Sequence, residues 1–239
     1  MSGHKWKVDV LLQGNWRGAS SVLLTGGSAP ILVDSGMPHD AHQLVKALAE
    51  RGLRPEEIPF VINTHFHLDH VSNNCLFPSS AIYATQLSSD WCRSLYSDFL
   101  ANGHWEKLIL KYYPETYEYE NAADLIGKIR KIAQRWWDAK RAGTSCQFRW
   151  IEKHHLPDGI EAITTSGHVP GHVSLVVRNG SETTIIAGDA LVTRTHDERV
   201  LTMIPHRRAQ YLLDRKTILS IPGIIIPGHD QPFENQPCP

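Results

Sequence analysis

The 239-residue chain is 41% hydrophobic and 21% charged, which is enough apolar material for one substantial core. These proportions exclude a disordered chain, a collagen-like repeat and a small disulfide-rich fold. The 24 basic and 25 acidic side chains give a net charge of −1, which argues against nucleic acid and anionic membranes as partners. The 14 histidines are the most informative part of the composition, because imidazole is the commonest protein metal ligand.

Targeting signals are not visible in the chain. Residues 1–7 lack the apolar segment of a signal peptide, and no run of about 18 uncharged apolar residues occurs. We therefore expect a cytoplasmic protein without a membrane span. No C-x-x-C pair occurs, so we expect incidental thiols rather than metal ligands at all four cysteines: Cys75, Cys92, Cys146 and Cys238.

Five short runs rich in Val, Leu and Ile predict strands in the first third of the chain. Glycine and proline separate the first three runs, which predicts a β-meander. After the third run, Leu44, Val45 and Leu48 recur at helical spacing and predict a helix over residues 40–51. The five strands are expected at residues 8–12, 21–24, 31–33, 60–62 and 81–84.

Residues 86–141 differ from their surroundings, because they contain 10 of the 20 aromatic side chains. Near the end of this stretch, apolar residues from Leu125 to Trp137 follow the spacing of an amphipathic helix. We interpret residues 86–141 as a helical cap inserted into a single domain that spans residues 1–239. Its aromatic side chains could fill a core, line a pocket or form a homodimer interface.

The last third of the chain again predicts strands, with a hairpin turn at Asn179-Gly180 and a helix over residues 208–219. The strands thus fall into two blocks, each followed by helices, which favours two sheets with helices outside them. The strands of the second block are expected at residues 160–164, 173–177, 184–187 and 224–226.

Three imidazoles and one carboxylate occur within six residues, soon after the strand predicted at 60–62. His65 and His67 are two residues apart, so in an extended segment they point the same way and can bind one metal ion. Asp69 and His70 follow where the chain turns away and can hold a second ion. Because neutral imidazoles cannot neutralise two adjacent dications, a complete site needs a further carboxylate from elsewhere.

Later segments supply further candidates, each at the end of a predicted strand. A glycine-containing turn carries His168 and His172, a hydrophobic strand leads into Asp189, and the last strand leads into His229. Small residues beside each candidate allow the backbone to turn sharply and to approach an ion closely.

In these four motifs the chain resembles the metallo-β-lactamase-fold hydrolases over nearly its whole length. The H-x-H-x-D-H signature of that family is residues 65–70, its glycine-flanked histidine turn is residues 167–172, and Asp189 and His229 match its bridging aspartate and closing histidine. The resemblance implies an α/β fold with four layers in αββα order, two mixed β-sheets inside and helices outside, interrupted by the helical insertion.

The resemblance also implies a ligand set, carried over position by position. Seven side chains would hold two metal ions: His65, His67 and His168 the first, Asp69, His70 and His229 the second, and Asp189 both.

Two further positions resemble family positions outside the ligand set. His172 either supports the site from behind the ligands or contacts the substrate, and both interpretations stay open. Asp34, after the strand at 31–33, is expected to brace the ligand loops. Isolated histidines are expected to have no role: His39, His42, His104 and His206.

Histidine and carboxylate ligands without thiolate favour zinc, with iron and manganese as alternatives. A water held between two such ions would have a pKa of about 7 or below, so the resemblance implies a metal-bridging hydroxide as the nucleophile. Asp189 would orient this hydroxide. Asp69, committed to the second metal, is a poor candidate for a free general base.

Differences between this sequence and known members of the family restrict the range of small-molecule substrates that we expect. β-Lactamases of this fold usually replace the bridging aspartate, which is present here as Asp189. The ten residues after His229 leave no room for the helical domain of glyoxalase-type thioesterases, and 239 residues cannot hold the extra domain of the large RNA-processing members. The expected activity is therefore hydrolysis of an ester, most specifically of a lactone such as an acyl-homoserine lactone.

A thioesterase and a phosphodiesterase or nuclease of the same fold are the alternatives. The helix predicted over residues 128–141 carries six basic side chains and one acidic one, which could follow a phosphate backbone. Residues 86–141 as a whole carry nine basic and eight acidic side chains, which is typical of a solvated surface. Residues 71–74 depart from the small, glycine-rich residues common in the family at this position and leave the floor of the pocket undefined.

Overall fold

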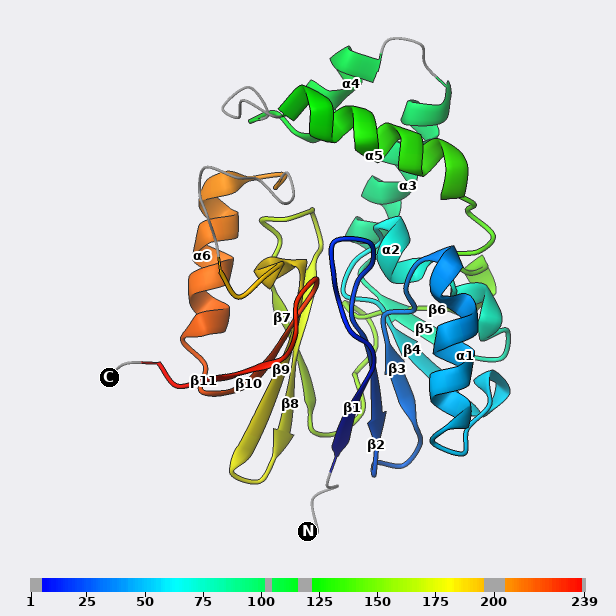
Figure 1. The fold of residues 1–239 in the computed structure, drawn as a ribbon, viewed down its shortest axis with the longest axis vertical. Coiled ribbons are helices and arrows are strands. Elements are labelled where there is room, and N and C mark those ends of the chain that lie inside the picture. Colours follow the sequence, from blue (N-terminus) through cyan, green and yellow to red (C-terminus); the bar gives the residue numbers. More distant parts are fainter. Residues whose placement is uncertain (1–5, 102–104, 116–121, 196–204, 238–239) are drawn as a thin grey trace.

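The structure is a computed structural model that describes residues 6–101, 105–115, 122–195 and 205–237. Two β-sheets pack face to face and helices cover their outer faces (Figure 1). Three helices of the insertion stand together at one end of the sheets. This is the predicted four-layer αββα arrangement of two mixed sheets with a helical insertion.

The first sheet has six strands in the order β1-β2-β3-β4-β5-β6. Its first three strands form the predicted antiparallel meander, and the later pairings are parallel. The strands are β1 (Lys7–Leu12), β2 (Ser21–Thr25), β3 (Ile31–Val33), β4 (Phe60–Ile62), β5 (Ala81–Ala84) and β6 (Phe148–Trp150).

The second sheet has five strands in the order β11-β10-β9-β8-β7. Strands β9 and β10 pair in parallel and the other pairings are antiparallel, so this sheet is mixed as well. The strands are β7 (Ile160–Thr164), β8 (Val173–Asn179), β9 (Glu182–Gly188), β10 (Gly223–Pro227) and β11 (Phe233–Asn235).

Side-chain alternation along the strands builds the layers, because neighbouring residues of a strand point to opposite faces of its sheet. The helices are α1 (Ala41–Ala49), α2 (Leu68–Val71), α3 (Gln86–Ala101), α4 (Trp105–Tyr112), α5 (Ala122–Trp136) and α6 (Arg208–Leu219). On β2, Val22 and Leu24 lie in the core between the sheets, whereas Leu23 packs outward with helix α1. On β9, Ile186 faces the other sheet and Ile185 packs with helix α6.

Strands β6 and β11 are not predicted by the sequence. Each has only three residues, and a polar or charged residue interrupts its apolar character. The hairpin between β8 and β9 turns on Gly180 and Ser181, one residue later than predicted, because Asn179 still pairs with Glu182.

The helix predicted as far as Arg141 is wrong at its end. Helix α5 ends at Trp136, and the Asp138 carboxylate accepts a hydrogen bond of 2.8 Å from the backbone N–H of Lys140. An aspartate that bonds the backbone two residues later favours a turn over a helix. Lys140 and Arg141 therefore do not extend the basic face of the helix.

Among the described residues, the cysteines form no disulfide: Cys92 is buried, and Cys75 and Cys146 are exposed. His104 and Cys238 lie outside the described residues. Within the described part of the chain, every helix is too short or too polar to cross a membrane.

Trp6 joins the edges of the two sheets. Its side chain is 3% exposed and packs in the core between the sheets, and its indole N–H donates to the Asp158 carbonyl over 3.0 Å. Its backbone N–H donates to the Asn179 amide oxygen over 2.7 Å, and the Asn179 amide nitrogen donates back to the Trp6 carbonyl. These bonds tie the start of β1 to the second sheet.

We expect Trp6→Ala to lower the free energy of unfolding by about 3–5 kcal/mol, because it removes a large buried aromatic side chain. Trp16→Ala is the matched control. Trp16 is 83% exposed, so its loss should change stability by less than about 0.5 kcal/mol. Urea unfolding of the two variants measures the difference, and equal stabilities would contradict the role given to Trp6.

Candidate metal centre

The candidate ligands converge because of strand direction. Strands β7, β9 and β10 run the same way in the second sheet, so their carboxyl ends lie at one edge. The segments that follow them carry His168, Asp189 and His229. The segment after β4 brings residues 65–70 to the same place from the first sheet. The site thus lies between the two sheets.

The structure brings together all seven side chains implied as ligands. They form two groups, and within each group the possible ligand atoms lie within 4.8 Å of one another. The first group contains His65, His67, His168 and Asp189, and the second contains Asp69, His70 and His229.

Asp189 faces both groups with different oxygens. Its Oδ2 lies 3.7 Å from His65 Nε2 and 3.4 Å from His168 Nε2. Its Oδ1 lies 3.4 Å from His70 Nε2 and also 3.4 Å from His229 Nε2. A carboxylate placed in this way can ligate one ion with each oxygen.

The polar atoms at the centre of the site make no hydrogen bond of good geometry. Both carboxylate oxygens of Asp189 are buried in this state, although burial of an uncompensated ion costs several kcal/mol. The Nε2 atoms of His65, His70 and His229 are likewise buried, and they face carboxylate oxygens only at 3.3–3.7 Å. Imidazole and carboxylate groups that converge without satisfying one another's hydrogen bonds are what a cation requires, so these residues fit two metal ions.

Asp34 orients His70 from behind. Its Oδ2 accepts hydrogen bonds of 2.8 Å from His70 Nδ1 and from the Thr64 hydroxyl, while Oδ1 accepts one of 2.9 Å from the Thr64 backbone N–H. Asp34 is the one described non-glycine residue with a left-handed backbone, at φ 55°. The bond to Nδ1 fixes the tautomer that presents Nε2 to the centre. This geometry agrees with the bracing role expected for Asp34.

His172 uses both ring nitrogens within the protein. Nδ1 lies 2.8 Å from the Thr165 hydroxyl, and Nε2 accepts a 3.0 Å hydrogen bond from the backbone N–H of Asp189. The residue is fully buried. Of the two interpretations left open by the sequence, this geometry favours a positioning role for His172 over contact with the substrate.

Two glycines allow the close approach around Asp189. A Cβ on Gly228 would lie 2.1 Å from Asp189 Oδ1. Gly188 has a left-handed φ of 52°, and its Cβ would lie 2.8 Å from His172 Nε2. The small residues noted beside the candidate ligands in the sequence therefore have a steric reason.

Polar residues after α2 form a buried brace, which accounts for the sequence of residues 71–74. The Asn73 amide donates to the carbonyls of Ser35 and Met37, over 3.0 and 2.6 Å. The Asn74 amide donates to Asn63 and Ala142. These bonds join the segment that follows the ligands to the loop after β3 and to the end of the insertion.

The two histidine groups have opposite pKa shifts in the metal-free protein. Burial lowers the pKa of His65 and His168 well below the usual range, and lowers that of His67 to about 4. In the second group burial acts in the same sense, but the surrounding carboxylates outweigh it. Asp189, Asp34 and Asp69 raise the pKa of His70 well above its usual range, and Asp189 and Asp69 raise that of His229 to about 10.

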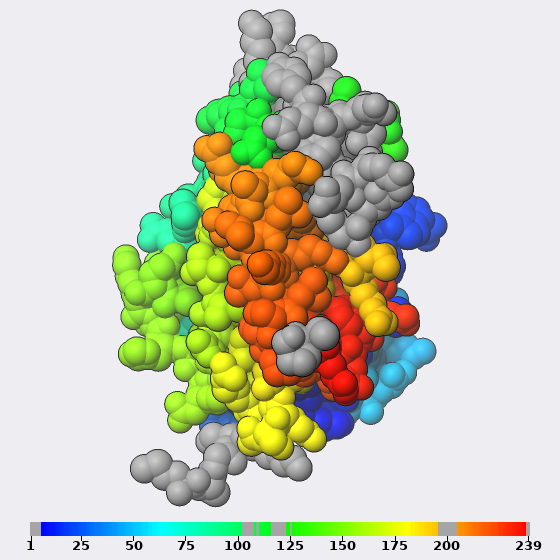
Figure 2. Space-filling view, turned by 90° about the vertical axis from the view of Figure 1, so that its left-hand side faces the viewer, coloured from blue at the N-terminus to red at the C-terminus, as the bar shows by residue number. Residues whose placement is uncertain are grey.

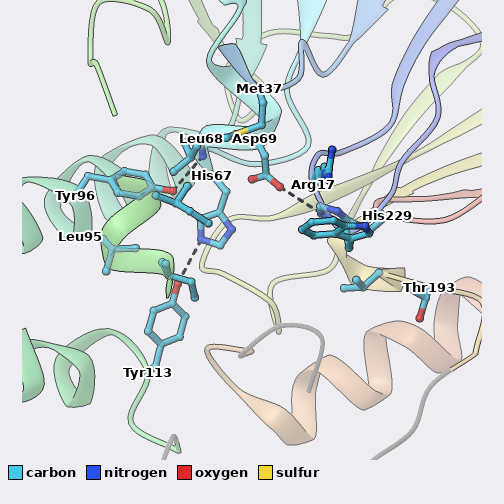
Figure 3. Close-up of a pocket in the computed structure, with 14 residues that line it drawn as sticks. Arg17, Met37, His67, Leu68, Asp69, Leu95, Tyr96, Tyr113, Thr193 and His229 are labelled. Atoms are coloured by element: carbon cyan, nitrogen blue, oxygen red, sulfur yellow. Dashed lines mark hydrogen bonds and ion pairs between the residues drawn. The ribbon is translucent and has the colours of Figure 1, made fainter. Parts of the chain in front are cut away.

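A pocket with a volume of about 390 Å³ opens beside the second group of ligands (Figure 3). His67, Asp69 and His229 form its polar side. The insertion supplies much of the opposite wall, which is mainly apolar. The wall residues from the insertion are Leu95, Tyr96, Tyr113, Ile129 and Ile132.

Trp16 and Arg17, in the loop between β1 and β2, complete the rim of this pocket. The sequence does not predict their position, because no spacing connects this loop with the insertion. The exposed fraction of Trp16, 83%, is unusual for a tryptophan and is the property that marks it as a rim residue.

The opposite pKa shifts predict unequal proton release when metal binds at pH 7. His70 and His229 are protonated in the metal-free protein and must lose about two protons to become ligands. His65, His67 and His168 are already neutral and release none. We therefore expect the second equivalent of Zn²⁺ to release more protons than the first, and its apparent affinity to rise with pH up to about 10.

Calorimetric titration in two buffers with different protonation enthalpies measures this release. Equal release at both steps, or none at either, would contradict the charge states inferred for the two groups.

Comparison with known proteins agrees with this geometry. The profile of the Metallo-beta-lactamase superfamily matches residues 14–229, which is most of the chain. Human metallo-beta-lactamase domain-containing protein 1 is 27% identical over 217 residues, which cover 90% of this chain and 64% of that protein. The chain therefore spans about two thirds of the length of that relative.

Two solved structures share the fold at low sequence identity. A protein of the metallo-beta-lactamase type from Thermotoga maritima superposes with a TM-score of 0.62 at 18% identity, covering 97% of this chain and 100% of its own. AidC, a dizinc quorum-quenching lactonase solved with a product, superposes with a TM-score of 0.60 at 19% identity, covering 88% of this chain and 72% of its own. From the profile match over most of its length, with a fold and two groups of candidate ligands that agree with it, the chain belongs to the metallo-β-lactamase superfamily.

Proposed function

We propose that the protein is a dinuclear metal-dependent hydrolase that cleaves a lactone bearing an apolar acyl group, of the acyl-homoserine lactone type. The observation that carries the proposal is the placement of Asp189. Its two oxygens face two separate histidine groups beside a pocket with an apolar wall. A thioester and a phosphodiester are the alternative substrates that the experiment below distinguishes.

The proposed ligand set follows the two groups of side chains. His65, His67 and His168 would hold the first ion, Asp69, His70 and His229 would hold the second, and Asp189 would serve both. When bound, two divalent ions of this kind supply an activated water and polarise the bond under attack. Zinc suits these imidazole and carboxylate ligands best, with iron and manganese as the alternatives.

The protein's own groups keep the site rigid during the reaction. Asp34 holds the His70 ring, and His172 holds the backbone from which the Asp189 carboxylate extends. The Asn15 carbonyl accepts a hydrogen bond of 2.8 Å from His229 Nδ1, which leaves Nε2 directed at the centre. Asp69 Oδ2 lies 3.3 Å from His229 Nε2 and would also ligate the second ion, so Asp69 is a positioning group rather than a free base.

The pocket supports a substrate with an apolar part. Ile129 and Ile132 of α5, with Leu95 of α3, offer a surface on which an acyl chain can lie. Arg17 is the one lysine or arginine among the described residues that line the pocket, which disfavours a polyanionic backbone. The lactonase AidC, solved with N-hexanoyl-L-homoserine, has the same fold and gives the proposal its substrate class.

The first test is reconstitution with Zn²⁺ followed by assay against a lactone, a thioester, a β-lactam and a phosphodiester. We expect about two ions per chain and hydrolysis of the lactone. His67→Ala and Asp189→Ala should each lower lactone turnover by at least about 100-fold, because loss of a partner behind a ligand already costs 10–100-fold. His155→Ala and Asp158→Ala, at exposed positions, are the matched controls.

Three outcomes would contradict the proposal. Fewer than one bound ion per chain would contradict the proposed metal centre. Unchanged lactone turnover in both ligand variants would contradict the proposed mechanism. Cleavage of the phosphodiester alone, strongly weakened by salt, would assign the protein to the nucleases of this fold.

The second test addresses the acyl group. Ile132→Ser should raise KM for N-decanoyl homoserine lactone by about 10-fold, because about 1.4 kcal/mol of apolar contact is lost. KM for γ-butyrolactone, which has no acyl chain, should not change. Leu213→Ser is the matched control, since Leu213 is 57% exposed on α6 and lies outside the pocket. An equal change in KM for both lactones in Ile132→Ser would contradict the proposal that the acyl chain lies against Ile132.

A further inference from the structure

His206 lies between the helical insertion and the turn that carries His168. Its backbone N–H donates a 2.8 Å hydrogen bond to the His168 carbonyl. Its Nδ1 lies 2.6 Å from the Tyr112 carbonyl, at the end of α4. The sequence analysis assigns no role to this isolated histidine, and its spacing gives no sign of these contacts.

The neighbouring residues make the same connection. The Arg207 N–H donates to the Gly167 carbonyl over 2.9 Å, and the Arg208 N–H donates to the Glu115 carboxylate over 2.6 Å. In Figure 2 the surface of residues 205–219, in orange, meets the green surface of the insertion. Residues 206–208 are therefore bonded to the insertion on one side and to a ligand turn on the other.

The contacts of His206 continue to a second candidate ligand. Tyr113, next to Tyr112, places its hydroxyl 3.4 Å from His67 Nε2. Trp91 contacts both histidines. The centre of its ring lies 5.5 Å from that of the His206 ring and 6.4 Å from that of the His67 ring. His67 Nδ1 and His168 Nε2 are 3.0 Å apart, and both side chains belong to the first group of candidate ligands. His206 is thus connected to His168 by its own backbone bond, and to His67 through the Tyr112–Tyr113 segment.

The ring of His206 has a defined tautomer. A carbonyl oxygen only accepts hydrogen bonds, so Nδ1 carries the hydrogen that it donates to Tyr112. The side chain therefore acts as a fixed hydrogen-bond donor.

We propose that His206 is a positioning residue that sets the separation of His67 and His168 by tying the insertion to the His168 turn. The inference rests on the proposed function, because it assigns the first ion to these two ligands. The backbone N–H of His206 holds the His168 turn directly. The His206 side chain holds the Tyr112–Tyr113 segment against His67. A substitution should therefore act on the first ion before any substrate is present.

The test is titration of the metal-free protein with Co²⁺, whose visible absorption reports ligand geometry. His206→Ala should weaken binding of the first ion by about 10-fold and change its spectrum, as loss of a group behind a ligand does. His206→Asn can donate from its amide to the Tyr112 carbonyl, so it should restore most of the affinity and the spectrum. His42→Ala, at an exposed position on α1, is the matched control and should titrate as wild type.

A double-mutant cycle tests the route through Tyr113. If His206 acts through that side chain, the effects of His206→Ala and Tyr113→Phe on Co²⁺ affinity should be less than additive. His206→Phe keeps a ring against Trp91 and removes only the donor. It should behave as His206→Ala does, and it replaces that variant should His206→Ala fail to fold.

The following results would overturn the proposal: wild-type Co²⁺ affinity and spectrum in a folded His206→Phe variant, equal losses in the Asn and Phe variants, or strictly additive effects in the cycle. A wild-type protein that binds no Co²⁺ overturns the metal centre and this inference together. One that binds Co²⁺ and leaves lactones intact overturns only the proposed substrate.

Discussion

A buried carboxylate whose two oxygens make no hydrogen bond of good geometry is the constraint on which the site depends. An uncompensated charge of this kind would oppose folding, so its surroundings must supply positive charge. In the metal-free protein His70 and His229 do so, because the charges of these side chains outweigh burial and hold the pKa of Asp189 well below its usual range. Two metal ions can take over this role only by displacing protons from the same histidines. Folding, protonation and metal binding are thus coupled through one aspartate.

The ligands and the pocket wall come from different parts of the chain. All seven candidate ligands lie in segments that follow strands of the two sheets, whereas the insertion supplies most of the apolar wall. A rigid ligand set on the strand ends can therefore be combined with a variable wall.

Much of the fold and the site could be predicted from the sequence. Short runs of Val, Leu and Ile mark strands such as β2 and β9, and strand-end motifs carry the candidate ligands. Contacts between segments far apart in the chain could not be predicted. His206 bonds to Tyr112, and Asn73 bonds to Ser35, and neither pair shares a spacing or periodicity. Strand β6 is missed for a similar reason, since three residues with a central arginine become a strand only by pairing with β5.

The hairpin tip between β1 and β2 combines two tasks in four residues. Asn15 pairs with Gly18 across the tip, and the Asn15 carbonyl fixes the His229 ring, while Trp16 and Arg17 between them form the rim of the pocket. A change in substrate preference that evolves at this tip is therefore not independent of metal retention. Variation here is restricted to side chains that leave the backbone of Asn15 in place, so exchange of residues 16 and 17 should be tolerated where insertion or deletion is not.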